Sequence, residues 1–193
     1  MLEMSGQRII PDEGNGWNFT ALRDINFYLQ YSHNCTEVNA RNRYDGVARF
    51  FRAYFYFEKV KRYGDIPWYD KALDSDDPEL YKARDSREFV MQKMLEDLDF
   101  AIANLPKTKN AYVLTRWTAL ALKSRVCLFE GTFRKYHGLA DCEKYLNACV
   151  SASETFMNES GYTLYKSGST PYRDLFASIN LQADEVIFGR DYE

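Results

Sequence analysis

Apolar side chains recur at helical spacing in five segments of the chain. The most regular segment is 85–105, where Met, Leu, Ile and Ala side chains follow the i, i+3, i+4, i+7 pattern without interruption. Four more segments with this periodicity cover about 17–32, 41–63, 115–130 and 141–158. We therefore expect a mainly all-α fold of antiparallel helices, joined by polar links that contain glycine or proline.

The helix expected at 41–63 should form the centre of this array. Between Val47 and Tyr63, apolar or aromatic side chains occur at nearly every angle around the helix axis, so that it lacks a wide polar face. Burial of each ring contributes roughly 1.5–3 kcal/mol, which favours a position surrounded by other helices. Gly64 then supplies the C-cap, and Pro67 prevents the helix from resuming.

Local signals predict the ends of the later helices. Asp85 followed by Glu88 matches a capping box at the start of the third helix. Thr115 is a suitable N-cap for the fourth helix, which we expect to end at about Glu130 with Gly131 beyond it. Arg125 and Glu130 lie among apolar neighbours, and we expect each to pair across a helix interface.

Composition and charge restrict the classes of function. Aromatic residues make up 16% of the 193 residues, which indicates either helix packing through rings or a surface that faces carbohydrate. The net charge is −3 and basic residues are interspersed with acidic ones, which argues against binding of nucleic acid. No apolar run reaches the 18 or so residues that a membrane-spanning helix requires.

The sequence carries no recognisable catalytic, metal or cofactor motif. The four cysteines have neither metal-ligand nor redox spacing, and we expect them to be buried free thiols. Carboxylate pairs could serve a glycosidase, but Asp97 with Asp99 should lie on the solvated side of a helix, and Asp184 with Glu185 on a terminal strand. We therefore predict a protein without enzymatic activity, cofactor or metal.

The run ARFFRAYFYFE at 48–58, followed by YGDIP at 63–67, combines arginine, aromatic and Gly-Asp-x-Pro positions in one stretch. This combination resembles the SusD/RagB family of surface glycan-binding lipoproteins. The spacing of Trp17, Arg23 and Asn26 resembles the family's first helix, and we expect Arg23 and Asn26 to bond each other or a neighbouring backbone. Further similarity covers residues 96–106 and 116–137, then a YxxLF turn at 172–176 and a DEVIF strand at 184–188.

The resemblance implies a fold and a division of the chain. The fold would be made of irregular tetratricopeptide-like helix pairs with a short terminal strand. Residues 1–16 would be a loop or frayed end, 17–158 the helical domain, and 159–193 a loop and strand leading into a carboxy-terminal part that this chain lacks. The family's export signal and lipid-bearing cysteine would also lie outside this chain.

The resemblance also implies function, partners and location. Such a protein would sit on the bacterial outer-membrane surface as a lipoprotein, bind an oligosaccharide or polysaccharide without catalysis, and deliver it to a TonB-dependent, SusC-like transporter. It would need no cofactor and would touch the membrane only through its lipid anchor. The alternative that the helix pattern leaves open is a tetratricopeptide-like scaffold that binds protein and no sugar.

Aromatic residues in or near the long loop after Pro67 are the candidate ligand contacts. Trp68, Tyr69 and Tyr81 are the candidates, because long loops with exposed aromatic rings are often functional and a flat ring can stack on a sugar. The alternative for Trp68 and Tyr69 is that they seal the end of the helix array. Trp17 is a further candidate, although we expect it to lie in the core.

Overall fold

The computed structural model describes residues 16–190, which form an all-α structure. The loop or frayed end was expected at residues 1–16, of which 1–15 lie outside the described residues. The α-helices are α1 (Thr20–Tyr31), α2 (Val38–Tyr63), α3 (Arg87–Asn104), α4 (Arg116–Tyr136), α5 (Cys142–Glu159) and α6 (Pro171–Ala177). Two short 3₁₀ helices, η1 (Ser32–Asn34) and η2 (Pro78–Tyr81), lie in the links.

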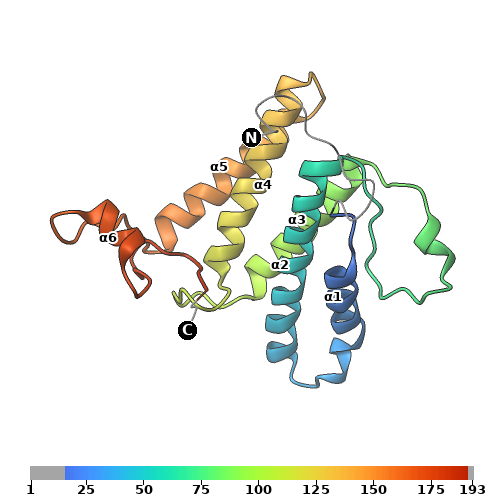
Figure 1. The fold of residues 1–193 in the computed structure, drawn as a ribbon, viewed down its shortest axis with the longest axis horizontal. Helices are drawn as coiled ribbons and strands as arrows, with labels where there is room; N and C mark the ends of the chain where they lie inside the picture. The colour runs from blue at the N-terminus through green and yellow to red at the C-terminus, as the bar shows by residue number, and fades with distance from the viewer. Residues whose placement is uncertain (1–15, 191–193) are drawn as a thin grey trace, which may run out of the picture.

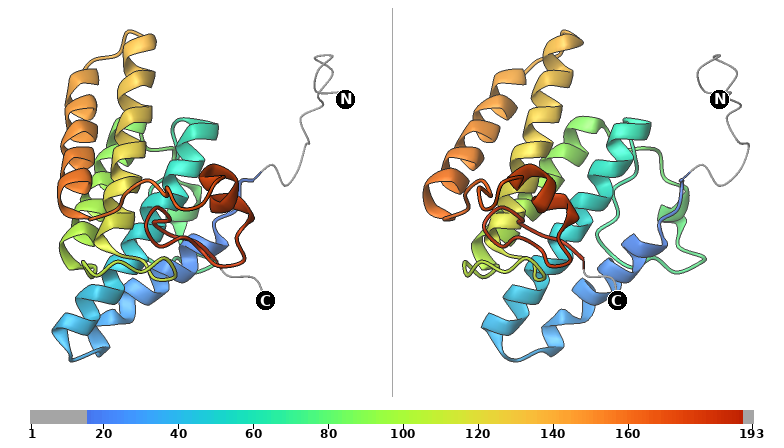
Figure 2. Two further views of the ribbon diagram at one scale, coloured as in Figure 1. Left: turned by 90° about the vertical axis from the view of Figure 1, so that its left-hand side faces the viewer. Right: turned by 60° about the vertical axis from the view of Figure 1, so that its left-hand side comes forward.

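Helices α1 to α5 run in alternating directions and pack as antiparallel neighbours (Figure 1). The most extensive helix contacts join α2 with α3 and α4 with α5, and α4 and α5 lie side by side in both views of Figure 2. This arrangement confirms the prediction of tetratricopeptide-like helix pairs. Within residues 16–190, no helix is both long and apolar enough to span a bilayer.

Helix α2 lies at the centre of the core, as its sequence predicted. Ala53, Tyr56 and Val60 are at most 1% exposed and belong to one cluster with side chains from α1, α3, α4 and the loop after α2. The expectation that α2 lacks an exposed face is wrong in part, since Phe51 and Tyr54 are 39% and 46% exposed. The neighbouring helices leave this strip of α2 uncovered.

The helix ends follow the sequence signals only in part. Thr115 caps α4 through a reciprocal capping box with Thr118, as expected of the N-cap. Helix α3 is capped instead by Ser86, whose hydroxyl accepts the Phe89 amide at 3.3 Å. Helix α4 also continues through Gly131 to Tyr136, so that this glycine is no stop signal.

Gly131 is required by packing between α4 and α5. A Cβ atom at this position would come within 2.8 Å of Leu146 Cγ and 3.1 Å of the Leu146 backbone nitrogen. A larger residue would therefore force the two helices apart. The glycine allows close contact at a place where the sequence pattern had indicated a helix end.

A buried ion-pair network joins α3, α4 and α5, and we call it the Glu130 network. Arg87 Nη2 and Arg134 Nε donate to Glu130 carboxylate oxygens at 2.7 and 2.8 Å, and the whole Glu130 residue is inaccessible to solvent. Arg134 also pairs with Glu88, which accepts the Tyr145 hydroxyl at 3.2 Å. The predicted pairing of Glu130 is confirmed, whereas Arg125 is exposed, so that its expected place in a helix interface is wrong. Glu88 contributes a helix-linking carboxylate rather than a capping box.

The chain after α5 packs without forming a strand. The strand expected at 184–188 is absent from the described residues, which form turns and bends there. Single backbone hydrogen bonds join Thr163 N to Asp184 O at 2.9 Å and Gly189 N to Ala111 O at 2.8 Å. A strand needs a continuous ladder with a neighbour, and no neighbouring strand is present among residues 16–190.

Candidate functional site

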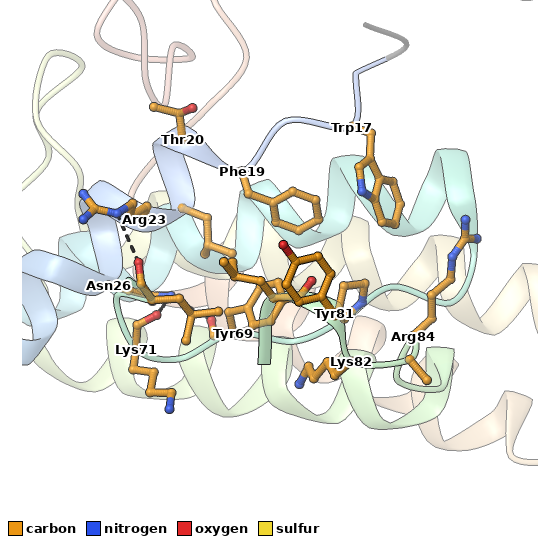
Figure 3. Close-up of a pocket in the computed structure, with 15 residues that line it drawn as sticks. Trp17, Phe19, Thr20, Arg23, Asn26, Tyr69, Lys71, Tyr81, Lys82 and Arg84 are labelled. Atoms are coloured by element: carbon orange, nitrogen blue, oxygen red, sulfur yellow. Dashed lines mark hydrogen bonds between the residues drawn. The ribbon is translucent and has the colours of Figure 1, made fainter. Parts of the chain in front are cut away.

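A groove of about 620 Å³ lies between the start of α1 and the loop of residues 67–84. Figure 3 shows Trp17 and Arg84 at one end, Arg23 and Lys71 at the other, and Phe19, Tyr69 and Tyr81 between them. Aromatic and basic side chains thus both line the groove. The full set of lining residues is Trp17, Phe19, Thr20, Leu22, Arg23, Asn26, Pro67, Tyr69, Lys71, Leu73, Leu80, Tyr81, Lys82, Ala83 and Arg84.

The groove brings together three of the four candidate aromatic residues. Tyr81 is 86% exposed and Trp17 is 44% exposed, so that the expected core position of Trp17 is wrong. Tyr69 also lines the groove but is only 9% exposed. The expected exposure of Tyr69 and Trp68 is therefore wrong, because the loop folds back and presses these two rings against the helices.

Trp68 lies beneath the loop and does not line the groove. Its ring stacks on Tyr56 of α2 with centroids 4.3 Å apart, and the Arg52 guanidinium lies 5.1 Å from its ring centroid. The residue is only 5% exposed. The alternative interpretation, that Trp68 seals the end of the helix array, is therefore confirmed.

The loop backbone is held by a buried polar cluster on α1, α2 and α3, which we call the Arg52 cluster. Arg52 donates two hydrogen bonds to Asp97, at 2.6 and 2.7 Å, and a third to Asn26 Oδ1 at 3.3 Å. Asn26 Nδ2 in turn donates to the carbonyl oxygens of Tyr69 at 2.9 Å and Lys71 at 3.2 Å. The cluster therefore connects three helices to the wall of the groove.

The environment of Asp97 differs from the one expected. The residue is 2% exposed, so that its predicted place on the solvated side of α3 is wrong. Burial raises the pKa of the Asp97 carboxyl, and the paired Arg52 guanidinium opposes that rise. Asp99, two residues further on, lies at the surface and pairs with Lys123 at 2.5 Å, so that the two carboxylates do not form a pair.

The loop is closed at its base by backbone and side-chain contacts. Ile66 and Asp85 form an isolated antiparallel bridge, and Asp85 Oδ2 accepts the Trp68 amide at 2.7 Å. The Tyr56 hydroxyl accepts the Tyr69 amide at 2.6 Å and donates to the Pro67 carbonyl at 3.2 Å. Burial raises the pKa of Tyr56, which keeps this hydroxyl protonated and able to donate.

Sequence reasoning missed most of the polar residues of the groove. Arg23 was expected to bond Asn26 or a neighbouring backbone, and its Nε does donate to the Leu73 carbonyl at 3.4 Å. Lys71, Lys82 and Arg84 carried no signal of their own, because single cations in a loop are ordinary. Their proximity to Tyr81 in sequence was the one available indication for Lys82 and Arg84.

The arrangement is suited to binding through rings and hydrogen-bond donors. An exposed tyrosine beside a row of partly covered aromatic residues provides a platform for an apolar ligand face. The surrounding cations supply donors for oxygen atoms. Within residues 16–190, no group of three His, Cys, Asp or Glu side chains is placed to hold a metal ion.

Comparison with known sequences gives a match to a family profile and a match to a curated relative. The profile of a family named SusD-like, described as "Starch-binding associating with outer membrane", matches residues 13–119. A curated relative, SusD-like protein P38 of Formosa agariphila, is 29% identical over 87 residues. That alignment covers 45% of this chain and 17% of the relative.

Comparison of the fold with solved structures leads to the same group of proteins. A SusD-like protein from Bacteroides fragilis superposes with a TM-score of 0.71 at 26% identity, covering 89% of this chain and 32% of that protein. A SusD superfamily protein from Bacteroides vulgatus has a TM-score of 0.71 at 19% identity, covering 91% of this chain and 35% of its own length. A laminarin-binding SusD-like protein has a TM-score of 0.68 at 17% identity, with 86% and 34% covered. The chain thus spans about a third of the length of these structures.

Proposed function

This chain belongs to the SusD-like family, described as starch-binding and associated with the outer membrane, and from this premise we propose that it binds an oligosaccharide or polysaccharide in the groove beside α1. The observation that carries the proposal is the convergence of Trp17, Tyr69 and Tyr81 on one groove. Tyr81 provides the most accessible ring, and Trp17 extends the aromatic surface at the groove end. Sugar rings stack on such surfaces through their C–H faces.

The family and its fold also support a wider role at the cell surface. The laminarin-binding relative with the same fold supports glycan capture as the activity. We propose that the protein acts without catalysis as a surface lipoprotein of the outer membrane, and that it delivers its glycan to a TonB-dependent, SusC-like transporter. A transporter gene beside the gene for this protein, and co-purification of the two products, would support the delivery step.

Glycan binding is tested by affinity electrophoresis in gels that contain starch, laminarin, xyloglucan or an acidic polysaccharide. Calorimetry then measures the affinity of the protein for each polymer that retards its migration. We expect Tyr81→Ala and Trp17→Ala each to weaken binding roughly tenfold, equivalent to about 1.4 kcal/mol. Tyr136→Ala is the matched control for Tyr81, because Tyr136 is 83% exposed on α4, away from the groove. Its binding should equal that of the unmodified chain.

The same experiment distinguishes the second class of function. A folded chain that no glycan in the panel retards would contradict the proposal and favour a protein-binding scaffold made of helix pairs. Equal losses in Tyr81→Ala and Tyr136→Ala would also contradict it, because they would show that retardation does not depend on the groove. Circular dichroism of each variant verifies that the helices remain formed.

A further inference from the structure

The groove differs in charge from the chain as a whole. The protein carries a net charge of −3, yet four cationic side chains line the groove: Arg23, Lys71, Lys82 and Arg84. Among the described residues that line it, none is aspartate or glutamate. The positive charge is therefore a local property of this site.

Two of the four cations are already neutralised by carboxylates outside the groove. Lys71 pairs with Glu79 at 2.9 Å and Asp77 at 3.5 Å. Lys82 pairs with Asp85 at 2.9 Å and also donates to the Trp68 carbonyl at 2.6 Å. These pairs hold the loop in shape and leave little charge for a ligand.

The two arginines remain available to a ligand. Within residues 16–190, neither Arg23 nor Arg84 forms a salt bridge with a carboxylate. Arg84 lies 4.9 Å from the Trp17 ring centroid, and this contact holds its guanidinium at the end of the groove. Arg23 makes a single 3.4 Å hydrogen bond to the Leu73 carbonyl, which leaves its terminal nitrogens free to donate.

The positions of these arginines suit a negatively charged chain of sugars. Arg84 and Arg23 lie at opposite ends of the aromatic row, with Tyr81 between them (Figure 3). A guanidinium forms two parallel hydrogen bonds with a carboxylate or another oxyanion, and these bonds are stronger than those to a neutral hydroxyl. A ring stacked on Tyr81 would place charged groups of the adjoining sugars near the arginines.

We propose that the ligand of this groove is an anionic oligosaccharide, with carboxylate or sulfate groups recognised by Arg23 and Arg84; the inference rests on the proposed glycan binding. Tyr81 holds a sugar ring by stacking, and the two arginines select the charged form over the neutral one. The carboxylate of a uronic acid and the sulfate ester of a sulfated sugar share this chemistry. The test separates them.

The experiment compares charged polymers with neutral counterparts of the same backbone by calorimetry. Polygalacturonate is paired with its methyl ester, and dextran sulfate with dextran, at low and moderate salt. We expect at least one charged polymer to bind tenfold or more tightly than its neutral match, and the difference to shrink as salt screens the charges. Preference for polygalacturonate assigns a carboxylate, and preference for dextran sulfate assigns a sulfate.

Variants then show whether the preference arises in the groove. Arg84→Gln and Arg23→Gln should each reduce binding of the charged polymer about tenfold and leave any binding of the neutral one unchanged. Arg125→Gln is the matched control, because Arg125 is exposed on α4, outside the groove. Tyr81→Ala should weaken both polymers, since stacking does not depend on charge.

The outcomes separate this inference from the proposed function. Equal binding of charged and neutral polymers, weakened by Tyr81→Ala but not by Arg84→Gln, would overturn the anionic ligand and retain glycan binding. Equal losses in Arg84→Gln and Arg125→Gln would also overturn it, because they would show non-specific ion exchange. Failure of every polymer to bind would remove the proposed function together with the inference.

Discussion

The Arg52 cluster and the Glu130 network are both buried arrangements of arginine and carboxylate, but they connect different kinds of structure. The Glu130 network joins side chains of α3, α4 and α5, with one contact to a link, from Arg134 Nη1 to the Ala140 carbonyl at 3.0 Å. The Arg52 cluster passes through Asn26 to two carbonyl groups of the loop that forms the groove wall. One network stabilises the helix array, and the other also shapes the candidate site.

This difference shows how an ordinary helix array can hold a long loop in one conformation. A loop of nearly twenty residues carries many backbone polar groups, and those that are buried require partners. Asn26 and Tyr56 supply such partners from α1 and α2. Asn26 and Tyr56 are buried among the helices, and their hydrogen bonds to the loop therefore help to determine the geometry of the groove.

The largest expected effect follows from removal of Glu130. Glu130→Ala leaves the buried Arg134 and the partly buried Arg87 without their shared carboxylate, and we expect the free energy of unfolding to fall by about 4 kcal/mol. Urea titration measures the loss. Because this network does not touch the loop of residues 67–84, the native state should show no faster tryptic cleavage after Lys71, Lys82 or Arg84.

Glu154→Ala is the matched control, since Glu154 is an exposed glutamate within α5. It should change stability by less than about 0.5 kcal/mol. A stability loss in Glu130→Ala no greater than this control would contradict the role assigned to the network. Selective tryptic cleavage within residues 67–84 in Glu130→Ala would contradict the proposal that only the Arg52 cluster shapes the loop.

A smaller but more informative effect is expected from Asp97→Asn. The substitution removes the charge that balances buried Arg52, and we expect the free energy of unfolding to fall by about 3 kcal/mol. Since Arg52 also contacts Asn26 and Trp68, tryptic cleavage within residues 67–84 should accelerate under native conditions and glycan binding should weaken. Asp99→Asn, an exposed aspartate two positions along α3, should leave all three measurements nearly unchanged.

The smallest effect on stability is expected from Asn26→Ala. Two loop carbonyls would lose the hydrogen bond from the Asn26 amide, which costs about 1.5 kcal/mol, while the Arg52–Asp97 pair remains. Hydrogen exchange should show faster opening of the loop and no change in α4 or α5. Asn147→Ala, at an exposed position on α5, is the control, and unchanged loop exchange in Asn26→Ala would show that Asn26 does not hold the groove wall.

Sequence reasoning predicted the parts of this protein that depend on local or periodic signals. The regular apolar spacing of 85–105 and the aromatic density of 41–63 predicted helices close to α3 and α2, with α2 in the core. Gly64 was correctly identified as the end of α2, where its φ of 71° favours glycine. Family-like motifs in the same helices also predicted the fold class.

The candidate site was predictable only in outline. Tyr81 and Trp17 were named from residue type, yet no periodic signal told which aromatic rings a long loop would expose. Trp68 was a candidate of equal standing, and its burial depends on Tyr56 and Arg52 twelve and sixteen residues earlier in the chain. Arg84 entered the site only because the loop returns it to Trp17.

By itself, the sequence determined the helices, the central place of α2 and membership of a glycan-binding family, because hydrophobic periodicity and local caps act over a few residues. Tertiary structure alone decided which rings face solvent, that Asp97 is buried against Arg52, and that Arg23 and Arg84 meet an aromatic row beside α1. These properties depend on contacts between residues up to about 70 positions apart, whose pairing follows from chain packing as a whole.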